Sequence, residues 1–133
     1  KETLVFGENF AKRLTGGEVL ALFGDLGAGK TKFLQGLAKG LGVKNKVNSP
    51  TFNILKIYKT KPGSKIKIFC HIDAYRLSSE KDLLALGVEE YFQDKNTVTA
   101  IEWAERIKKI LPKKTIIVDI KHLSEDERII KIK

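Results

Sequence analysis

The sequence has almost no cysteine: Cys70 is the only one among its 133 residues. The chain can therefore form no internal disulfide and no cluster of thiolate metal ligands, which favours a protein of the reducing cytosol. Long hydrophobic runs are also missing, since the longest, 19–23, has five residues and a membrane-spanning helix needs about 20. The first residues do not resemble a signal peptide. These absences predict a soluble, cytoplasmic protein without a membrane partner.

Acidic residues are in the minority. There are 16 Asp and Glu residues against 25 Lys and Arg residues, which gives a formal net charge of +9. Such an excess attracts polyanions, including nucleotides and RNA. It is equally typical of a solvated, lysine-rich surface, because 21 of the basic residues are lysines and most are scattered along the chain. The composition leaves both interpretations open.

Strand-like and helix-like patterns alternate along the chain without a repeat or a compositional break. With 42% hydrophobic residues, this predicts one α/β domain spanning 1–133, with helices flanking a mixed parallel and antiparallel sheet of about seven strands. The expected strands are 4–6, 18–23, 52–58, 66–72, 97–102, 115–121 and 128–132. The expected helices are 8–14, 30–39, one beginning at Ser79, 88–92 and 104–111. Antiparallel hairpins are expected at 52–72 and 115–132, around turn-forming residues.

A glycine-rich stretch joins the second of these strands to the helix that follows it. Residues 24–31 read GDLGAGKT, a full match to G-x-x-x-x-G-K-[ST]. The glycines let successive backbone N–H groups point inward around a phosphate at the helix N-terminus. Lys30 would reach the β- and γ-phosphates, and the Thr31 hydroxyl would bind Mg²⁺. The residues predicted to contact the phosphates are Asp25, Leu26, Gly27, Ala28, Gly29, Lys30 and Thr31.

Two acidic residues are candidates to hold or orient the metal. Asp73 follows the apolar run that ends at Ile72, and Glu102 follows Val98, Ala100 and Ile101. Both are therefore expected at the carboxyl edge of the sheet, where ligands bind in α/β folds. Asp119 is a third candidate, but its strand is expected to enter a hairpin, which favours a structural role. The sequence does not decide which acid orients an attacking water.

Several other side chains have weaker patterns. Thr51, in the tripeptide S-P-T, lies where NTPases have a loop that senses the γ-phosphate, although turn chemistry taken alone favours a plain loop. His71 and His122 have no Cys or His neighbours at metal-ligand spacing and are predicted to be structural. Trp103 and Tyr75 lie beside the acids and would either line the site or belong to the core.

Two classes of P-loop protein are weakly supported. The stretch 45–48 reads NKVN and lacks the final Asp of the guanine-reading N-K-x-D motif. The four arginines are spread along the chain, whereas a small-molecule kinase usually has an arginine-rich lid over the transferred phosphate. Guanine specificity is therefore unsupported, and a small P-loop kinase stays as an alternative.

Taken together, five stretches resemble the TsaE family, formerly YjeE: GDLGAGKT from Gly24, SPTF from Ser49, HIDAYRL from His71, LGVEEYF from Leu86 and IEWAER from Ile101. The resemblance covers nearly the whole chain in order. It implies a P-loop NTPase-like three-layer sandwich and a Mg²⁺-dependent ATPase with low activity on its own. It further implies partners, TsaB and TsaD, with which the ATPase acts to install the threonylcarbamoyl group on the tRNA adenosine beside the anticodon. TsaD would carry out the transfer, and ATP hydrolysis would support repeated turnover of the complex.

The same resemblance implies roles for individual residues. Lys30 and Thr31 would contact the phosphates and Mg²⁺, Thr51 would belong to a switch-like loop, Asp73 would be the Walker B-type acid, and Glu102 would complete the metal site with Trp103 beside it. The resemblance thus assigns catalysis to Lys30, Asp73 and Glu102. Direct contact with tRNA is left open.

A basic RNA-binding module with a vestigial P-loop is the alternative from another class. The net charge of +9 motivates it. Against it, the phosphate motif is intact, and the aromatic residues are not interleaved with basic ones as stacking platforms usually are. An RNA affinity that ignores ATP would distinguish this alternative from the ATPase.

Overall fold

The computed structural model describes residues 2–24, 29–45, 47, 54–75, 77, 79–122 and 128–133, with the backbone alone for His122 and Arg128. Its elements are α1 (Glu2–Ala11), β1 (Val19–Phe23), α2 (Lys30–Gly40), β2 (Leu55–Lys59), β3 (Ile68–Asp73), α3 (Glu80–Leu84), α4 (Val88–Gln93), β4 (Thr97–Glu102), the 3₁₀ helix η1 (Ala104–Ile110), β5 (Ile116–His122) and β6 (Arg128–Ile132). None of the helices in the described part of the chain has the length and hydropathy of a membrane span.

The strands form one mixed sheet with the order β2-β3-β4-β1-β5-β6. The four inner strands run parallel, because β4 pairs in parallel with both β3 and β1, and β1 pairs in parallel with β5. The two outer strands are antiparallel to their neighbours. Both expected hairpins are thus confirmed, as is the mixed sheet. The described residues contain six strands and not seven.

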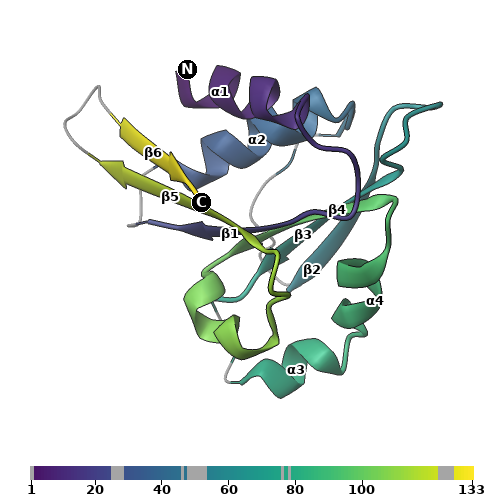
Figure 1. Cartoon of the computed structure of the whole chain (residues 1–133), viewed down its shortest axis with the longest axis vertical. Coiled ribbons are helices and arrows are strands. Elements are labelled where there is room, and N and C mark those ends of the chain that lie inside the picture. The colour runs from purple at the N-terminus through teal and green to yellow at the C-terminus, as the bar shows by residue number, and fades with distance from the viewer. Residues whose placement is uncertain are drawn as a thin grey trace.

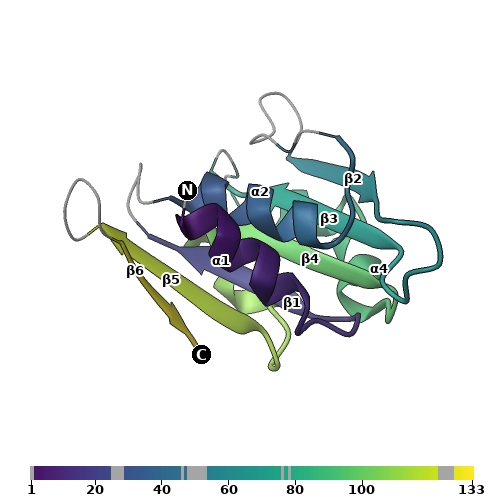
Figure 2. The ribbon, with the colours of Figure 1, turned by 90° about the horizontal axis from the view of Figure 1, so that it is seen from above.

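Helices cover both faces of the sheet and make three layers (Figures 1 and 2). Side chains alternate across a strand, so Leu20 and Leu22 of β1 pack in the core beneath α1 and α2. Val19 and Ala21 lie in the opposite core, with buried residues of α3, α4 and η1. The expected three-layer sandwich is therefore confirmed.

The N-terminus departs from the sequence-based expectation. A strand at 4–6 and a separate helix at 8–14 were expected, but α1 runs unbroken from Glu2 to Ala11. The apolar residues of this segment have a partner in α2: Phe6 and Phe10 lie with ring centroids about 6 Å from that of Phe33. The segment therefore covers the sheet as part of a helical layer and does not extend it. Helical spacing of Phe6 and Phe10 places both rings on that side.

The segment after β4 also differs from the expectation. A helix was expected at 104–111, and the structure has a 3₁₀ helix with a non-helical residue, Ile107, inside it. Ala104 and Ile107 are both buried, and their spacing of three residues matches the 3₁₀ period. Pro112 disfavours a helical conformation for the residue before it, and Leu111 is accordingly extended, so the helical segment ends at Ile110.

The α1–α2 contact depends on glycines. A Cβ atom on Gly36 would clash with the backbone carbonyl oxygen of Leu4, and one on Gly7 would clash with the carbonyl oxygen of Phe33. The two helix backbones thus approach more closely than any larger residue allows.

Gly36→Ala is therefore expected to destabilise the protein. The methyl group has to push α1 away from α2, and overpacking of this kind costs about 1–3 kcal/mol of unfolding free energy. Chemical denaturation would measure the loss. Lys32→Ala, at an exposed position of the same helix, is the control and should leave the denaturation midpoint close to the wild-type value. A midpoint of Gly36→Ala equal to that of wild type would contradict the close contact.

Candidate nucleotide site

The carboxyl ends of three strands meet at one edge of the sheet. Asp73 is the last residue of β3 and lies opposite Glu102, the last residue of β4. Glu102 in turn lies opposite Leu22, one residue before the end of β1. The strand order thus brings together residues that lie far apart in the sequence. Both acids are at the sheet edge where they were expected.

The helix α2 begins at the same edge. Gly29 precedes it with φ of 107° and ψ of 12°, a left-handed conformation that glycine adopts without steric cost. Lys30 is the first helical residue, and Thr31 lies exposed in the first turn. Asp25, Leu26, Gly27 and Ala28 of the predicted phosphate loop lie outside the described residues, as does Thr51.

Lys30 is a buried cation. Its side chain is only 5% exposed, and among the residues that the structure describes its ammonium group has no hydrogen-bond partner. The Nζ atom lies 4.1 Å from the centroid of the Trp103 ring. This cation–π contact stabilises the charge only in part, because burying an ammonium group without hydrogen bonds is costly.

Trp103 has a conformation that is rare for its residue type. Its φ of 59° is the one positive value among the described non-glycine residues, and a bulky side chain adopts it only where the surroundings enforce it. The ammonium group of Lys30 lies over the indole ring of Trp103. The centroids of the Trp103 and Tyr75 rings are 4.8 Å apart. Trp103 thus contacts both Lys30 and Tyr75, and it also packs against the hydrophobic core on that face of the sheet. The sequence had left open whether the two aromatic residues line the site or belong to the core.

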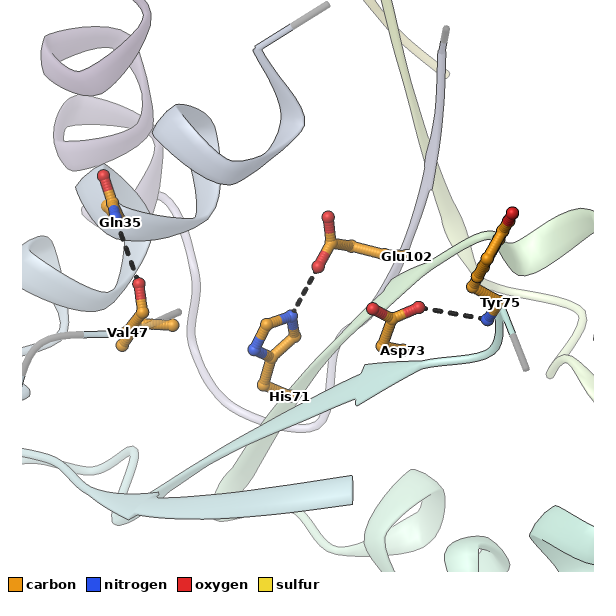
Figure 3. A network of polar contacts seen from close by, with 6 residues as sticks. All are labelled: Gln35, Val47, His71, Asp73, Tyr75 and Glu102. Carbon is orange, nitrogen blue, oxygen red and sulfur yellow. Dashed lines mark hydrogen bonds and ion pairs between the residues drawn. The ribbon is translucent and has the colours of Figure 1, made fainter. Parts of the chain in front are cut away.

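Glu102 has a specific polar partner. Its Oε2 atom lies 2.9 Å from Nε2 of His71, and both side chains are buried (Figure 3). The prediction that His71 is merely structural thus missed its contact with a candidate site residue. The signal was in the sequence, because His71 lies two residues before Asp73, and residues at that spacing share one face of a strand.

Asp73 is half-buried and close to several charges. Burial raises the pKa of its carboxyl group, and the neighbouring Glu102 acts in the same direction. The backbone N–H of Tyr75, which donates a hydrogen bond of 3.0 Å to Oδ1, opposes this, as do the nearby His71 and Lys30. The ionised form of Asp73 is therefore less stable in the folded protein than in water, and a bound cation would stabilise it.

Asp119, the third acid considered, lies on β5 opposite Phe23 of β1. Its strand pairs with β6 in the expected hairpin. Because β5 runs parallel to β1 and Phe23 is the last residue of β1, Asp119 also lies near the edge of the sheet where the glycine-rich stretch begins.

The arrangement of these elements defines a class. A parallel core flanked by helices, with a glycine-rich connection from the central strand β1 to α2 and two acids on adjacent strand ends, is a P-loop NTPase-like fold. Comparison with known proteins then identifies the family. The family model described as "Threonylcarbamoyl adenosine biosynthesis protein TsaE" matches residues 1–130, and the chain belongs to this family.

Individual relatives agree with the family assignment. The chain is 44% identical over 112 residues to the tRNA threonylcarbamoyladenosine biosynthesis protein TsaE of Bacillus subtilis, a match that covers 84% of this chain and 66% of that protein. It is 41% identical over 134 residues to the protein of the same name from Rickettsia typhi, covering 100% of this chain and 89% of the relative.

A solved structure has the same fold. The crystal structure of YdiB from Bacillus subtilis superimposes with a TM-score of 0.75 at 35% sequence identity. The match covers 98% of this chain and 77% of that one. The family resemblance and the fold class expected from the sequence are both confirmed.

Proposed function

We propose that residues 1–133 form a single domain that binds and hydrolyses ATP with Mg²⁺ and thereby acts in the biosynthesis of threonylcarbamoyladenosine in tRNA. The observation that carries the proposal is the buried ammonium group of Lys30. It has no hydrogen-bond partner among the described residues and lies at the start of α2. A protein keeps such a group at a cost, and perturbed charges of this kind are typical of functional sites.

A triphosphate fits this position chemically. Its oxygens accept hydrogen bonds from an ammonium group, and they also accept from the backbone N–H groups at the N-terminus of α2. Lys30 would thus exchange its contact with the Trp103 ring for contacts with a ligand of opposite charge. The partial positive charge at the helix end acts in the same direction.

The acids fit a magnesium ion. Mg²⁺ is usually held by one or two carboxylates together with phosphate oxygens of the substrate and water. Asp73 and Glu102 supply carboxylates from adjacent strand ends, and Thr31 supplies a hydroxyl from the first turn of α2. These three residues would hold the ion, which when bound neutralises charge on the phosphates. A cation also relieves the repulsion between two neighbouring carboxylates.

Membership of the family supports a proposal about the partners and the place of action. We propose that the chain acts in the cytoplasm with TsaB and TsaD, which carry out the modification, and that its ATP hydrolysis supports repeated turnover of that complex. Thr51 is proposed as part of a loop that responds to the bound nucleotide. A switch of this kind would change the surface offered to TsaD between nucleotide states.

The proposal is tested by an ATPase assay with purified chain, alone and with TsaB and TsaD. We expect low Mg²⁺-dependent hydrolysis by the chain alone and a clear increase when the partners are added. Absence of hydrolysis in the complete mixture, together with RNA binding that does not respond to ATP, would contradict the proposal. That result would favour the basic RNA-binding module in its place.

The single tryptophan is expected to report nucleotide binding. Because the indole of Trp103 lies 4.1 Å from the ammonium group of Lys30, a ligand that draws the lysine away changes the charge next to the ring. The fluorescence emission of the wild-type protein should therefore change when ATP is titrated in, and not when adenosine is. The same titration of Lys30→Met should give little change, since no cation then leaves the ring. A signal of wild-type size in Lys30→Met would contradict the link between lysine and indole.

A further inference from the structure

His71 and Glu102 form a buried pair on adjacent strands. Nε2 of His71 lies 2.9 Å from Oε2 of Glu102, and the two side chains are 1% and 5% exposed. The two residues are not direct partners in the strand register, since His71 lies opposite Ala100. The Glu102 side chain therefore leans back along the sheet toward the imidazole, as Figure 3 shows.

The chemistry of the pair fixes the direction of its hydrogen bond. With Glu102 in its ionised form, the carboxylate can only accept, and we assign the proton in this contact to Nε2 of His71 on that basis. The other ring nitrogen, Nδ1, is buried and has no hydrogen-bond partner among the described residues. Within the described part of the chain, the contact with Glu102 is therefore the one hydrogen bond of the imidazole. On its other side the ring stacks on Phe69, with ring centroids 6.4 Å apart and an interplanar angle of 18°.

We propose that His71 is a positioning residue that holds the Glu102 carboxylate in the orientation needed at the metal and the attacking water. The stack on Phe69 fixes the plane of the imidazole, and the Nε2–H group fixes one carboxylate oxygen. Figure 3 shows the second oxygen of Glu102 turned away from the histidine. This hydrogen bond restricts the rotamers of the Glu102 side chain, so that little conformational entropy is lost when the carboxylate binds a ligand. Supporting contacts of this type are typical around metal sites.

This inference rests on the proposed ATPase function and is tested with three substitutions. His71→Leu removes the donor. His71→Gln places its amide N–H group near the position of Nε2, whereas the amide of His71→Asn is one bond shorter and falls near Nδ1. If His71 positions Glu102, the Leu and Asn variants should lose about 10- to 100-fold in Mg²⁺-dependent kcat/KM, measured with TsaB and TsaD present. The Gln variant should regain most of this activity, and all three should bind ATP in EDTA as the wild-type protein does.

A matched control separates positioning from stability. Ile120→Val shortens a fully buried side chain of β5, a strand that neighbours neither β3 nor β4 in the sheet. This control should lower the melting temperature while leaving the Mg²⁺-dependent kcat/KM near the wild-type value. Equal activity of His71→Leu and wild type would overturn the inference, and so would equal activities of the Gln and Asn variants. Crystal structures of His71→Leu and His71→Gln provide a second test that does not depend on enzymatic activity. The Glu102 carboxylate should shift in the first and stay in place in the second.

Failure of the proposed function looks different from failure of this inference. If the chain does not hydrolyse ATP at all, the wild-type protein is inactive with its partners, and the crystal structures alone decide about His71. A Glu102 carboxylate that keeps its position in His71→Leu would then overturn the positioning role. Active wild-type protein with unaffected variants would overturn the inference and leave the ATPase in place.

Discussion

Lys30→Ala is expected to lower the ATPase activity in the presence of TsaB and TsaD by about 10²- to 10³-fold, the usual loss when a group that stabilises transition-state charge is removed. The side chain is buried at the start of α2 close to Asp73, and phosphate oxygens can supply the hydrogen bonds that the described residues do not give its ammonium group. Steady-state hydrolysis of ATP at saturating Mg²⁺ measures the loss. Undiminished turnover in Lys30→Ala would refute the assignment of the site.

Two further variants make the Lys30 result interpretable. Lys32→Ala removes an exposed lysine two residues along the same helix and should keep wild-type activity, which excludes a general effect of net charge. Lys30→Met keeps most of the aliphatic stem and loses the charge. Because an ammonium group without hydrogen bonds is costly to bury, Lys30→Met should melt at or above the wild-type temperature while being as inactive as Lys30→Ala. A large drop in its melting temperature would mean that Lys30 serves the fold.

Local patterns predicted the elements that lie around the glycine-rich stretch. The apolar run before it became β1, and the amphipathic segment after it became α2. Placing Asp73 and Glu102 at strand ends needed only the positions at which two apolar runs stop. The parallel arrangement then brought these ends to the same edge. Features that depend on one element and its flanking residues are thus accessible from the sequence.

Features that depend on contacts between distant segments were missed. Residues 2–11 form one helix that packs its aromatic residues and Gly7 against α2. The spacing of Phe6 and Phe10 is compatible with this helix, but the surface of α2 that stabilises it lies outside the segment. The hydrogen bond of His71 joins residues 31 positions apart. The left-handed backbone of Trp103, with φ of 59°, is likewise enforced by its surroundings. These features are determined by contacts between distant segments, which override the secondary-structure propensities of the local residues.

Glu102→Gln is expected to separate nucleotide binding from hydrolysis. Glutamine has the shape of glutamate, and its carbonyl oxygen can still accept the hydrogen bond from His71, so the site should keep its geometry. What is lost is the negative charge at a buried position, 4% exposed, beside the proposed metal. If Glu102 orients the attacking water, turnover should fall by about 10²- to 10⁴-fold, the range typical of a general base. ATP binding, measured by the fluorescence of Trp103, should stay near the wild-type affinity.

Asp73→Asn is the counterpart that assigns roles to the two acids. Asparagine can still accept the hydrogen bond that the Tyr75 N–H donates to Oδ1, so the turn after β3 should persist. Burial raises the pKa of Asp73, which means that its ionised form is disfavoured in the folded state, and the neutral amide should not lower the melting temperature at neutral pH. If Asp73 is the main metal ligand and Glu102 acts chiefly on the attacking water, this variant should need about 10-fold more Mg²⁺ for half-maximal activity. The Mg²⁺ requirement of Glu102→Gln should then change much less, and added Mg²⁺ should not restore its activity. The opposite pattern, with activity of Glu102→Gln restored by Mg²⁺ and that of Asp73→Asn not, would exchange the two roles.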